Sequence, residues 1–419
     1  MHFSQTSNNS FEQDYRFVDV GESPQEMMKT ILLIGFVGLF GIISRAQLSS
    51  GFEPAEARDM IALCNSFTFL DLYGSDEEII PEGYELVHTS SIIGMDNLFQ
   101  VYRKGEVGVI NLRGSTAHKD SWMENFYSVM IPAQDTIVID SLPHPYVFGK
   151  EDSCSVHAGY ALAIAFLVDS VEHQIHELRQ SGVRHFLITG HSQGGALAQL
   201  LMAYVHHHPD SRIRDNFYKT YAFASPKPGN KIFAQEYTKN HKGYSYDVIN
   251  PADLIPRFPF HYNDTDIVSK EDLRALFKKD ESFNLKQKIG DGTKRMFEIP
   301  MRGTFRLVGS SAFRQIYKDV ADVQMPKSDK DLNFFRLDSI VELERFDYPK
   351  ILLDSAILDN PRSAKWPRDS LGYFKNDEFY RQEPKSWQHK PYNYYVMVLK
   401  MYFPEQYEAL EKKYLMENI

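Results

Sequence analysis

Cysteine is scarce in this chain, which holds only Cys64 and Cys154 among its 419 residues. Neither lies in a Cys-x-x-Cys pair or beside a spaced pair of histidines, so a zinc site built on cysteine is not expected. In an exported protein the two thiols can form one disulfide bond. Cys64 falls in an apolar pattern with Met60 and Ile61, however, and a small buried thiol is the simpler interpretation there.

Positive charge is also in short supply, with 46 basic against 56 acidic residues and a net charge of -10. We find no basic block or arginine-rich arm, and therefore do not expect nucleic acid as a partner. Internal repeats and low-complexity tracts are lacking as well. Hydrophobic residues make up 43% of the chain, which is enough for a sizeable core. Enzymes of mixed α/β type often reach this length as one domain.

The longest apolar run near the start is too short to cross a bilayer, because it covers Ile31–Ile43 whereas a span needs about 20 residues. Met28-Lys29 provides a short basic start, and Ser44-Arg45-Ala46 places small residues where a signal peptidase reads them. We interpret 28–46 as a secretory signal peptide and expect a secreted or periplasmic protein without a stable transmembrane anchor. A buried core helix is the alternative.

Residues 1–27 are polar and acidic, and they would place the signal peptide inside the chain. We interpret them as an upstream extension, with Met28 as the true start. The domain organisation expected is therefore an extension at 1–27, a signal peptide at 28–46 and one α/β domain at 47–419.

Strands and helices alternate from Val107 onward, which is typical of a mostly parallel sheet with right-handed crossovers flanked by helices. Residues 126–155, with several prolines, are predicted to be irregular. Residues 262–350 are rich in charge and amphipathic stretches, and we expect a largely helical insertion on the catalytic face. The predicted strands are 107–112, 186–189, 221–224 and 246–249, and the predicted helices are 158–180, about 195–207 and 231–238.

The strongest motif is Gly190-His191-Ser192-Gln193-Gly194, placed between a buried strand and a helix. A serine in such a turn has strained backbone angles and presents its hydroxyl clear of the sheet, and the glycines avoid clashes on either side. The helix that follows points its N-terminal dipole at the site, which favours a developing anion. Ser192 is therefore the candidate nucleophile.

A serine nucleophile needs a base, and the base needs an orienting carboxylate. In this fold class they follow in the order serine, acid, histidine. Asp253 comes just after the strand at 246–249, where open α/β sheets place their sites, although a simple turn aspartate is the alternative. Only His261 and His389 follow it. His261 is eight residues from Asp253 on what would be the same loop, so we choose His389.

Two hydrogen-bond donors near the acyl oxygen are also required. The backbone N–H of Gln193, the residue after the nucleophile, is the first candidate. The second is expected from the loop at 113–116, which follows the predicted strand at 107–112.

Taken together, these segments resemble the class 3 lipases, the fungal-type triacylglycerol lipases. The resemblance runs from about Val107 to Pro259 and resumes near His389, with Gln193 in place of the commoner leucine. The 135 residues between Asp253 and His389 exceed the spacing in compact members. The motifs that carry the resemblance are Asn111-Leu112-Arg113-Gly114-Ser115, Asp120-Ser121-Trp122, Val156-His157-Ala158-Gly159-Tyr160, Gly190 to Ala198, Phe223 to Asn230 and Val248 to Pro256.

The resemblance implies an α/β-hydrolase fold and a triad of Ser192, Asp253 and His389. It also implies Ser115 and Gln193 as oxyanion donors, with Ser115 donating through hydroxyl and N–H, and a structural role for His157. The expected activity is hydrolysis of an acyl-lipid or other ester through a covalent acyl-enzyme, at a lipid–water interface, without cofactor or metal. A lid formed by 126–155 or 262–350 is a further hypothesis. The alternatives are an acyltransferase, a phospholipase, or a non-catalytic binding protein of this fold.

Overall fold

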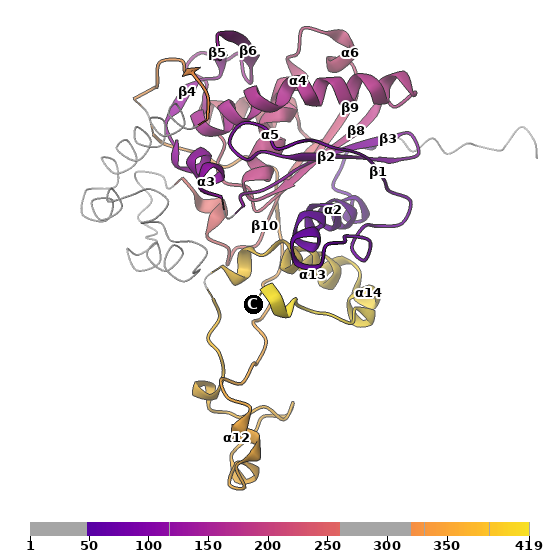
Figure 1. Cartoon of the computed structure of the whole chain (residues 1–419), viewed down its shortest axis with the longest axis vertical. Coiled ribbons are helices and arrows are strands. Elements are labelled where there is room, and N and C mark those ends of the chain that lie inside the picture. Colours follow the sequence, from indigo (N-terminus) through magenta and orange to yellow (C-terminus); the bar gives the residue numbers. More distant parts are fainter. Residues whose placement is uncertain (1–47, 117, 260–319, 331, 385, 419) are drawn as a thin grey trace, which may run out of the picture. The chain divides into compact units, whose positions relative to one another are not determined.

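The computed structural model describes residues 48–116, 118–259, 320–330, 332–384 and 386–418 (Figure 1). The predicted extension, the signal peptide and residues 260–319 of the predicted insertion lie outside the described residues. So does His261, the alternative base.

A seven-stranded sheet forms the centre of the described chain, in the order β1-β2-β3-β8-β9-β10-β12. From β3 to β12 neighbouring strands run parallel, whereas β1 and β2 add an antiparallel edge. The predicted α/β fold class, with a mostly parallel sheet, is thereby confirmed. The strands are β1 Glu85–Thr89, β2 Phe99–Lys104, β3 Val107–Leu112, β8 His185–His191, β9 Phe217–Phe223, β10 Ser245–Ile249 and β12 Ile340–Glu342.

Helices cover both faces of this sheet, so its central strands are buried on both sides, as parallel strands usually are. Alternate residues of β8 belong to different cores: Phe186 and Ile188 pack into one cluster and Leu187 into the other. The first cluster includes α4 Ala158–Gln180 and α5 Gln193–His206, and the second includes α2 Pro54–Tyr73 and α13 Pro391–Tyr402 (Figure 1).

The predicted elements that surround the site are confirmed. The strand at 107–112 and the helix at 158–180 have the predicted bounds, and the helix expected at 231–238 is α7 Lys231–Asn240. Helix α5 begins two residues earlier than expected, directly after Ser192.

Residues 126–155 are not irregular, contrary to prediction. They include β4 Met130–Pro132, β5 Gln134–Ile139 and β6 Leu142–Val147, and β7 Ser155–His157 pairs with β4. Strand β6 is the edge of a three-stranded sheet of order β11-β5-β6, and an edge strand tolerates proline because half of its N–H groups need no partner. The two-residue turn at 140–141 has positive φ at both positions, the geometry of a tight hairpin.

The described part of the insertion also differs from the expected helices. The described residues of 320–350 form no helix and supply β11 Val323–Gln324, which pairs with β5, and β12, which lies parallel to β10 in the central sheet. A small aromatic cluster follows, in which Trp366, Phe374 and Phe379 contact one another at ring-centroid distances of 5.0–5.7 Å. The remaining helices are α3 Lys119–Phe126, α6 Ser211–Arg214, α12 Ala356–Asp359 and α14 Pro404–Ala409.

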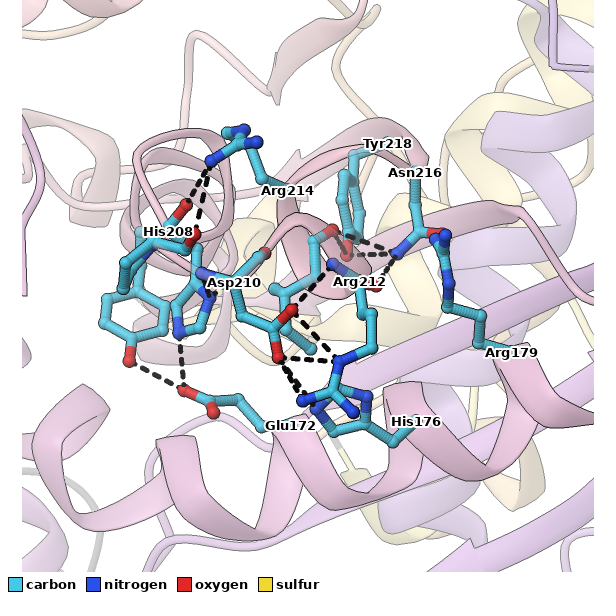
Figure 2. Close-up of polar contacts among 12 residues, drawn as sticks. Glu172, His176, Arg179, His208, Asp210, Arg212, Arg214, Asn216 and Tyr218 are labelled. Carbon is cyan, nitrogen blue, oxygen red and sulfur yellow. Dashed lines mark hydrogen bonds and ion pairs between the residues drawn. The ribbon is translucent and has the colours of Figure 1, made fainter.

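The side chain of His208, two residues past the end of α5, is buried rather than solvated. Its Nε2 lies 3.1 Å from Glu172 of α4, and Tyr204 donates to the same carboxylate (Figure 2). A second ion pair joins His176 to Asp210, which caps α6. These contacts fasten the ends of α5 and α6 to α4.

Both cysteines are buried free thiols, so the described structure contains no bridge between Cys64 and Cys154. Within the described ranges we find no helix with the length and apolar character of a membrane span.

Candidate active site

The turn between β8 and α5 has the strained geometry expected of a nucleophile elbow. Ser192 adopts φ 60° and ψ -127°, a backbone region that residues other than glycine rarely occupy. A Cβ on Gly190 would lie 2.3 Å from backbone atoms of Gly194, and a Cβ on Gly194 would lie 2.2 Å from the carbonyl oxygen of Leu112. Both glycines are therefore required sterically.

Ser192 and His389, 197 positions apart, meet at this turn. The Oγ of Ser192 lies 2.9 Å from Nε2 of His389, and Nδ1 of His389 lies 2.7 Å from Oδ2 of Asp253. Because the Asp253 carboxylate accepts, Nδ1 carries the proton and Nε2 is left to accept from the serine hydroxyl. The arrangement can remove a proton from Ser192 and return it to a leaving group.

Asp253 is held in place by further donors. It is 3% exposed and follows β10, and its Oδ1 accepts from the backbone N–H of Ile255 at 2.9 Å. Its Oδ2 also accepts from the hydroxyl of Tyr394 at 2.8 Å, and that hydroxyl accepts in turn from the N–H of Asn250. Burial raises the pKa of Tyr394 well above its ordinary value, so the phenol stays a donor.

His389 belongs to a short turn, Trp387–His389, that leads into α13. Its ring packs against His191, with ring centroids 4.7 Å apart. Burial lowers the pKa of His191 well below its ordinary value, so this neighbour is neutral. A neutral ring provides packing without opposing the imidazolium that His389 forms when it takes a proton.

The loop after β3 lies against the elbow from the other side. A Cβ on Gly114 would come within 2.6 Å of the carbonyl oxygen of His191. Arg113 fixes this loop by an ion pair with Asp96 at 3.1 Å, and the hydroxyl of Thr116 donates to the same carboxylate.

This approach brings the Oγ of Ser115 to 2.7 Å from Oε1 of Gln193. Gln193 is the first residue of α5, where backbone N–H groups have no partner within the helix and carry the positive end of its dipole. The two predicted oxyanion donors thus lie side by side at the elbow.

His157, expected to be structural, is fully buried and caps α4, with Nδ1 accepting from the N–H of Tyr160. Burial lowers its pKa to about 3, so the ring is neutral.

The structure therefore brings together all five residues selected from the sequence: Ser115, Ser192, Gln193, Asp253 and His389. Sequence reasoning missed Tyr394, Glu124 and Asn125, which hold these residues by hydrogen bonds. Tyr394 lies in an apolar helix, and Glu124 and Asn125 follow the Asp120-Ser121-Trp122 motif. Within the described part of the chain, no group of three or more histidine, cysteine or acidic side chains is arranged to hold a metal ion.

The parallel sheet, the helices on both faces and the elbow at the end of β8 are the features of the α/β-hydrolase fold. The family model of the class 3 lipases matches residues 109–263, which include the elbow and Asp253. This part of the chain is similar to the class 3 lipases.

Curated relatives resemble about a quarter of the chain. A secreted mono- and diacylglycerol lipase of Malassezia restricta, LIP4, is 31% identical over 107 residues, which is 25% of this chain and 34% of that protein. The secreted mono- and diacylglycerol lipase 1 of Fusarium solani is 31% identical over 108 residues, 25% of this chain and 30% of its own length. The match thus spans about a third of each relative.

Among solved structures, the triacylglyceride lipase of Rhizomucor miehei is similar with a TM-score of 0.37 and 17% identity, covering 50% of this chain and 77% of that one. Lipase II of Rhizopus niveus has a TM-score of 0.34 and 18% identity, covering 49% and 74%.

Proposed function

We propose that this protein is a serine ester hydrolase that cleaves acyl lipids, with Ser192 as nucleophile, His389 as base and Asp253 as the orienting acid. The observation that carries the proposal is the chain of contacts from Ser192 Oγ to His389 Nε2 at 2.9 Å and from His389 Nδ1 to Asp253 at 2.7 Å. Its position at the elbow of a class 3 lipase region supports an ester rather than another acyl substrate.

In the first half of the reaction, His389 takes the hydroxyl proton as Ser192 attacks the acyl carbon. The resulting oxyanion is stabilised by the backbone N–H of Gln193 and by Ser115. His389 then gives its proton to the departing alcohol, which leaves the acyl group on Ser192. In the second half, His389 activates a water molecule, which attacks the acyl-enzyme and releases the fatty acid.

Acylglycerols are the substrate class we infer. Both curated relatives described above are named as secreted mono- and diacylglycerol lipases. We also propose secretion, because 28–46 has the pattern of a signal peptide. The hydrolase domain would then occupy 47–419 of the mature chain.

Hydrolysis of p-nitrophenyl esters from acetate to palmitate, and of mono-, di- and triolein, tests this proposal. We expect the wild type to release fatty acid, and Ser192→Ala and His389→Ala each to lower kcat by about 10⁴ or more. Tyr392→Phe is a matched control on α13, because its hydroxyl bonds to the backbone of Lys412 rather than to the site. A folded wild type that cleaves none of these esters, or a Ser192→Ala variant that keeps its activity, would refute the proposal.

A further inference from the structure

The side chain of Gln193 is part of a polar network that the acyl-transfer chemistry above does not use. Gln193 is 2% exposed, and its Nε2 donates to Oε2 of Glu124 in α3. Glu124 is fully buried, and its other oxygen accepts from Asn97. A buried carboxamide and a buried carboxyl are costly unless they are hydrogen-bonded, so this pair holds Gln193 in one orientation.

That orientation aims Oε1 of Gln193 at the oxyanion loop. The hydroxyl of Ser115 donates to this oxygen at 2.7 Å, and Nδ2 of Asn125 donates to it at 2.8 Å. Asn125 also donates to the Oγ of Ser115 at 2.9 Å. Asn125 is itself fixed, because its Oδ1 accepts from the hydroxyl of Tyr160 at 2.9 Å. The side chain of Ser115 is thus held between two amide groups.

We propose that the carboxamide of Gln193, anchored by Glu124, is a positioning residue that holds the hydroxyl of Ser115 ready to turn toward the acyl oxygen. This inference rests on the proposed function. In the absence of substrate the hydroxyl hydrogen is directed to Oε1 of Gln193. When the oxyanion forms, the hydrogen turns to it, and Oε1 keeps its hydrogen bond from Asn125. No buried acceptor is left unpaired by the turn, so the donor becomes available at small cost.

The chemistry of the anchor agrees with this role. Burial raises the pKa of Glu124 well above its ordinary value, which favours a neutral carboxyl. A neutral anchor orients Gln193 without placing a fixed negative charge behind the position where the oxyanion develops.

A double-mutant cycle between Gln193→Met and Ser115→Ala tests the proposal, since methionine keeps the length of the side chain and removes its hydrogen bonds. The readouts are kcat and KM for p-nitrophenyl butyrate, per active site titrated with a fluorophosphonate. We expect Ser115→Ala to lower kcat by about 10²–10³, as loss of an oxyanion donor does. Gln193→Met should lower kcat by about tenfold or more with KM nearly unchanged. In the Ser115→Ala background it should have almost no further effect, because coupled residues are not additive.

The matched control is Gln199→Met on the same helix. Gln199 is 1% exposed, and its carboxamide accepts from Ser225 rather than from Ser115. It should fold as Gln193→Met does and keep the wild-type kcat. Full kcat in Gln193→Met, or effects of Gln193→Met and Ser115→Ala that multiply, would overturn the positioning role.

A second pair of variants keeps the proposal testable if Gln193→Met fails to fold. Glu124→Leu removes the acceptor for Nε2 of Gln193 and should lower kcat as Gln193→Met would. Glu124→Gln is neutral and keeps a carbonyl oxygen that accepts from Nε2 of Gln193, so its kcat should stay within a few-fold of wild type. Equal kcat in the two variants would overturn the role of the anchor. A wild type that neither reacts with the fluorophosphonate nor cleaves the ester would instead overturn the proposed function, and this inference with it.

Discussion

The phenol of Tyr394 donates a hydrogen bond to Oδ2 of Asp253 at 2.8 Å. The same oxygen accepts from Nδ1 of His389 at 2.7 Å, so two donors share one oxygen of a buried carboxylate. Each donor disperses part of the negative charge that the other interacts with. The carboxylate that orients His389 is therefore contacted from α13, the helix that begins two residues after the histidine.

Removal of this phenol is expected to shift the pH profile. In Tyr394→Phe the Asp253 carboxylate keeps more of its charge for His389 and stabilises the imidazolium that forms when the ring takes a proton. The acid limb of kcat/KM, which reports the free base, should move to higher pH. The backbone N–H of Asn250 loses its acceptor as well, which should lower the free energy of unfolding by about 1–3 kcal/mol.

The control for this prediction is Tyr392→Phe, a substitution of the same kind on the same helix. The measurement is kcat/KM for a soluble ester between pH 5 and 9. An acid limb in Tyr394→Phe that coincides with those of wild type and Tyr392→Phe would contradict an effect of the Tyr394 hydroxyl on His389.

The elbow glycines should differ in their tolerance of alanine. In Gly194→Ala the Cβ would meet the carbonyl oxygen of Leu112 at 2.2 Å, and we expect a loss of about 3 kcal/mol or more of stability. In Gly195→Ala the nearest backbone oxygen, of Phe223, is 3.0 Å away, so the loss should be clearly smaller. Thermal unfolding of both variants measures this order, and equal stability would show that the elbow relaxes freely.

The ion pair of Glu172 and His208 should make stability depend on pH (Figure 2). Burial alone would lower the pKa of His208, but the hydrogen bond to Glu172 raises it. The contribution of His208 to the free energy of unfolding is therefore complete below pH 6.5 and is lost as pH rises through its pKa in the folded protein. Burial alone would raise the pKa of Glu172, but hydrogen bonds from His208 and Tyr204 lower it. The contribution of Glu172 to the free energy of unfolding is therefore present above pH 4.5 and is lost as pH falls through its pKa in the folded protein.

The pair should therefore stabilise most between about pH 4.5 and 6.5, by about 1 kcal/mol or less because the Glu172 carboxylate is partly exposed to solvent. His208→Gln should reduce the free energy of unfolding in that window and have less effect at pH 8. His173→Gln, which removes an exposed histidine from α4, the helix of Glu172, is the control. A His208→Gln effect that is constant from pH 5 to 8 would rule out the charged pair.

Both cysteines should be unreactive in the folded protein. Burial raises the pKa of Cys64 to about 12 and also raises that of Cys154, so little thiolate forms near neutral pH. A thiol reagent should label both residues in denaturant and neither, over minutes, in native buffer. Rapid labelling of native Cys64 would show that α2 opens readily.

Much of the sheet and the sharp turn at Ser192 could be predicted from sequence because their signals are local. An apolar run gives β3, a periodic apolar face gives α4, and Gly190 and Gly194 bracket the serine. The hairpin β5–β6 was missed because its prolines look like breakers until the edge position of β6 is known. Strand β12 was missed because its pairing with β10 depends on contacts far apart in the chain.

At the site, residue types and chain order were sufficient to select Ser192, Asp253 and His389. Supporting residues are different, since Tyr394 and Glu124 act through contacts with residues 141 and 69 positions away. Neither has a motif of its own. Their roles depend on burial, which raises the cost of any unpaired polar group and so determines which partners must meet.

Covalent labelling tests the central claim most directly. The protein is incubated with a fluorophosphonate and digested, and the modified residue is identified by mass spectrometry in wild type, His389→Ala and Tyr392→Phe. The account predicts one adduct, on Ser192, formed rapidly in wild type and Tyr392→Phe and at least about 10³ times more slowly in His389→Ala. An adduct on another residue, or equal rates in all three proteins, would contradict the assignment of Ser192 and His389 as nucleophile and base.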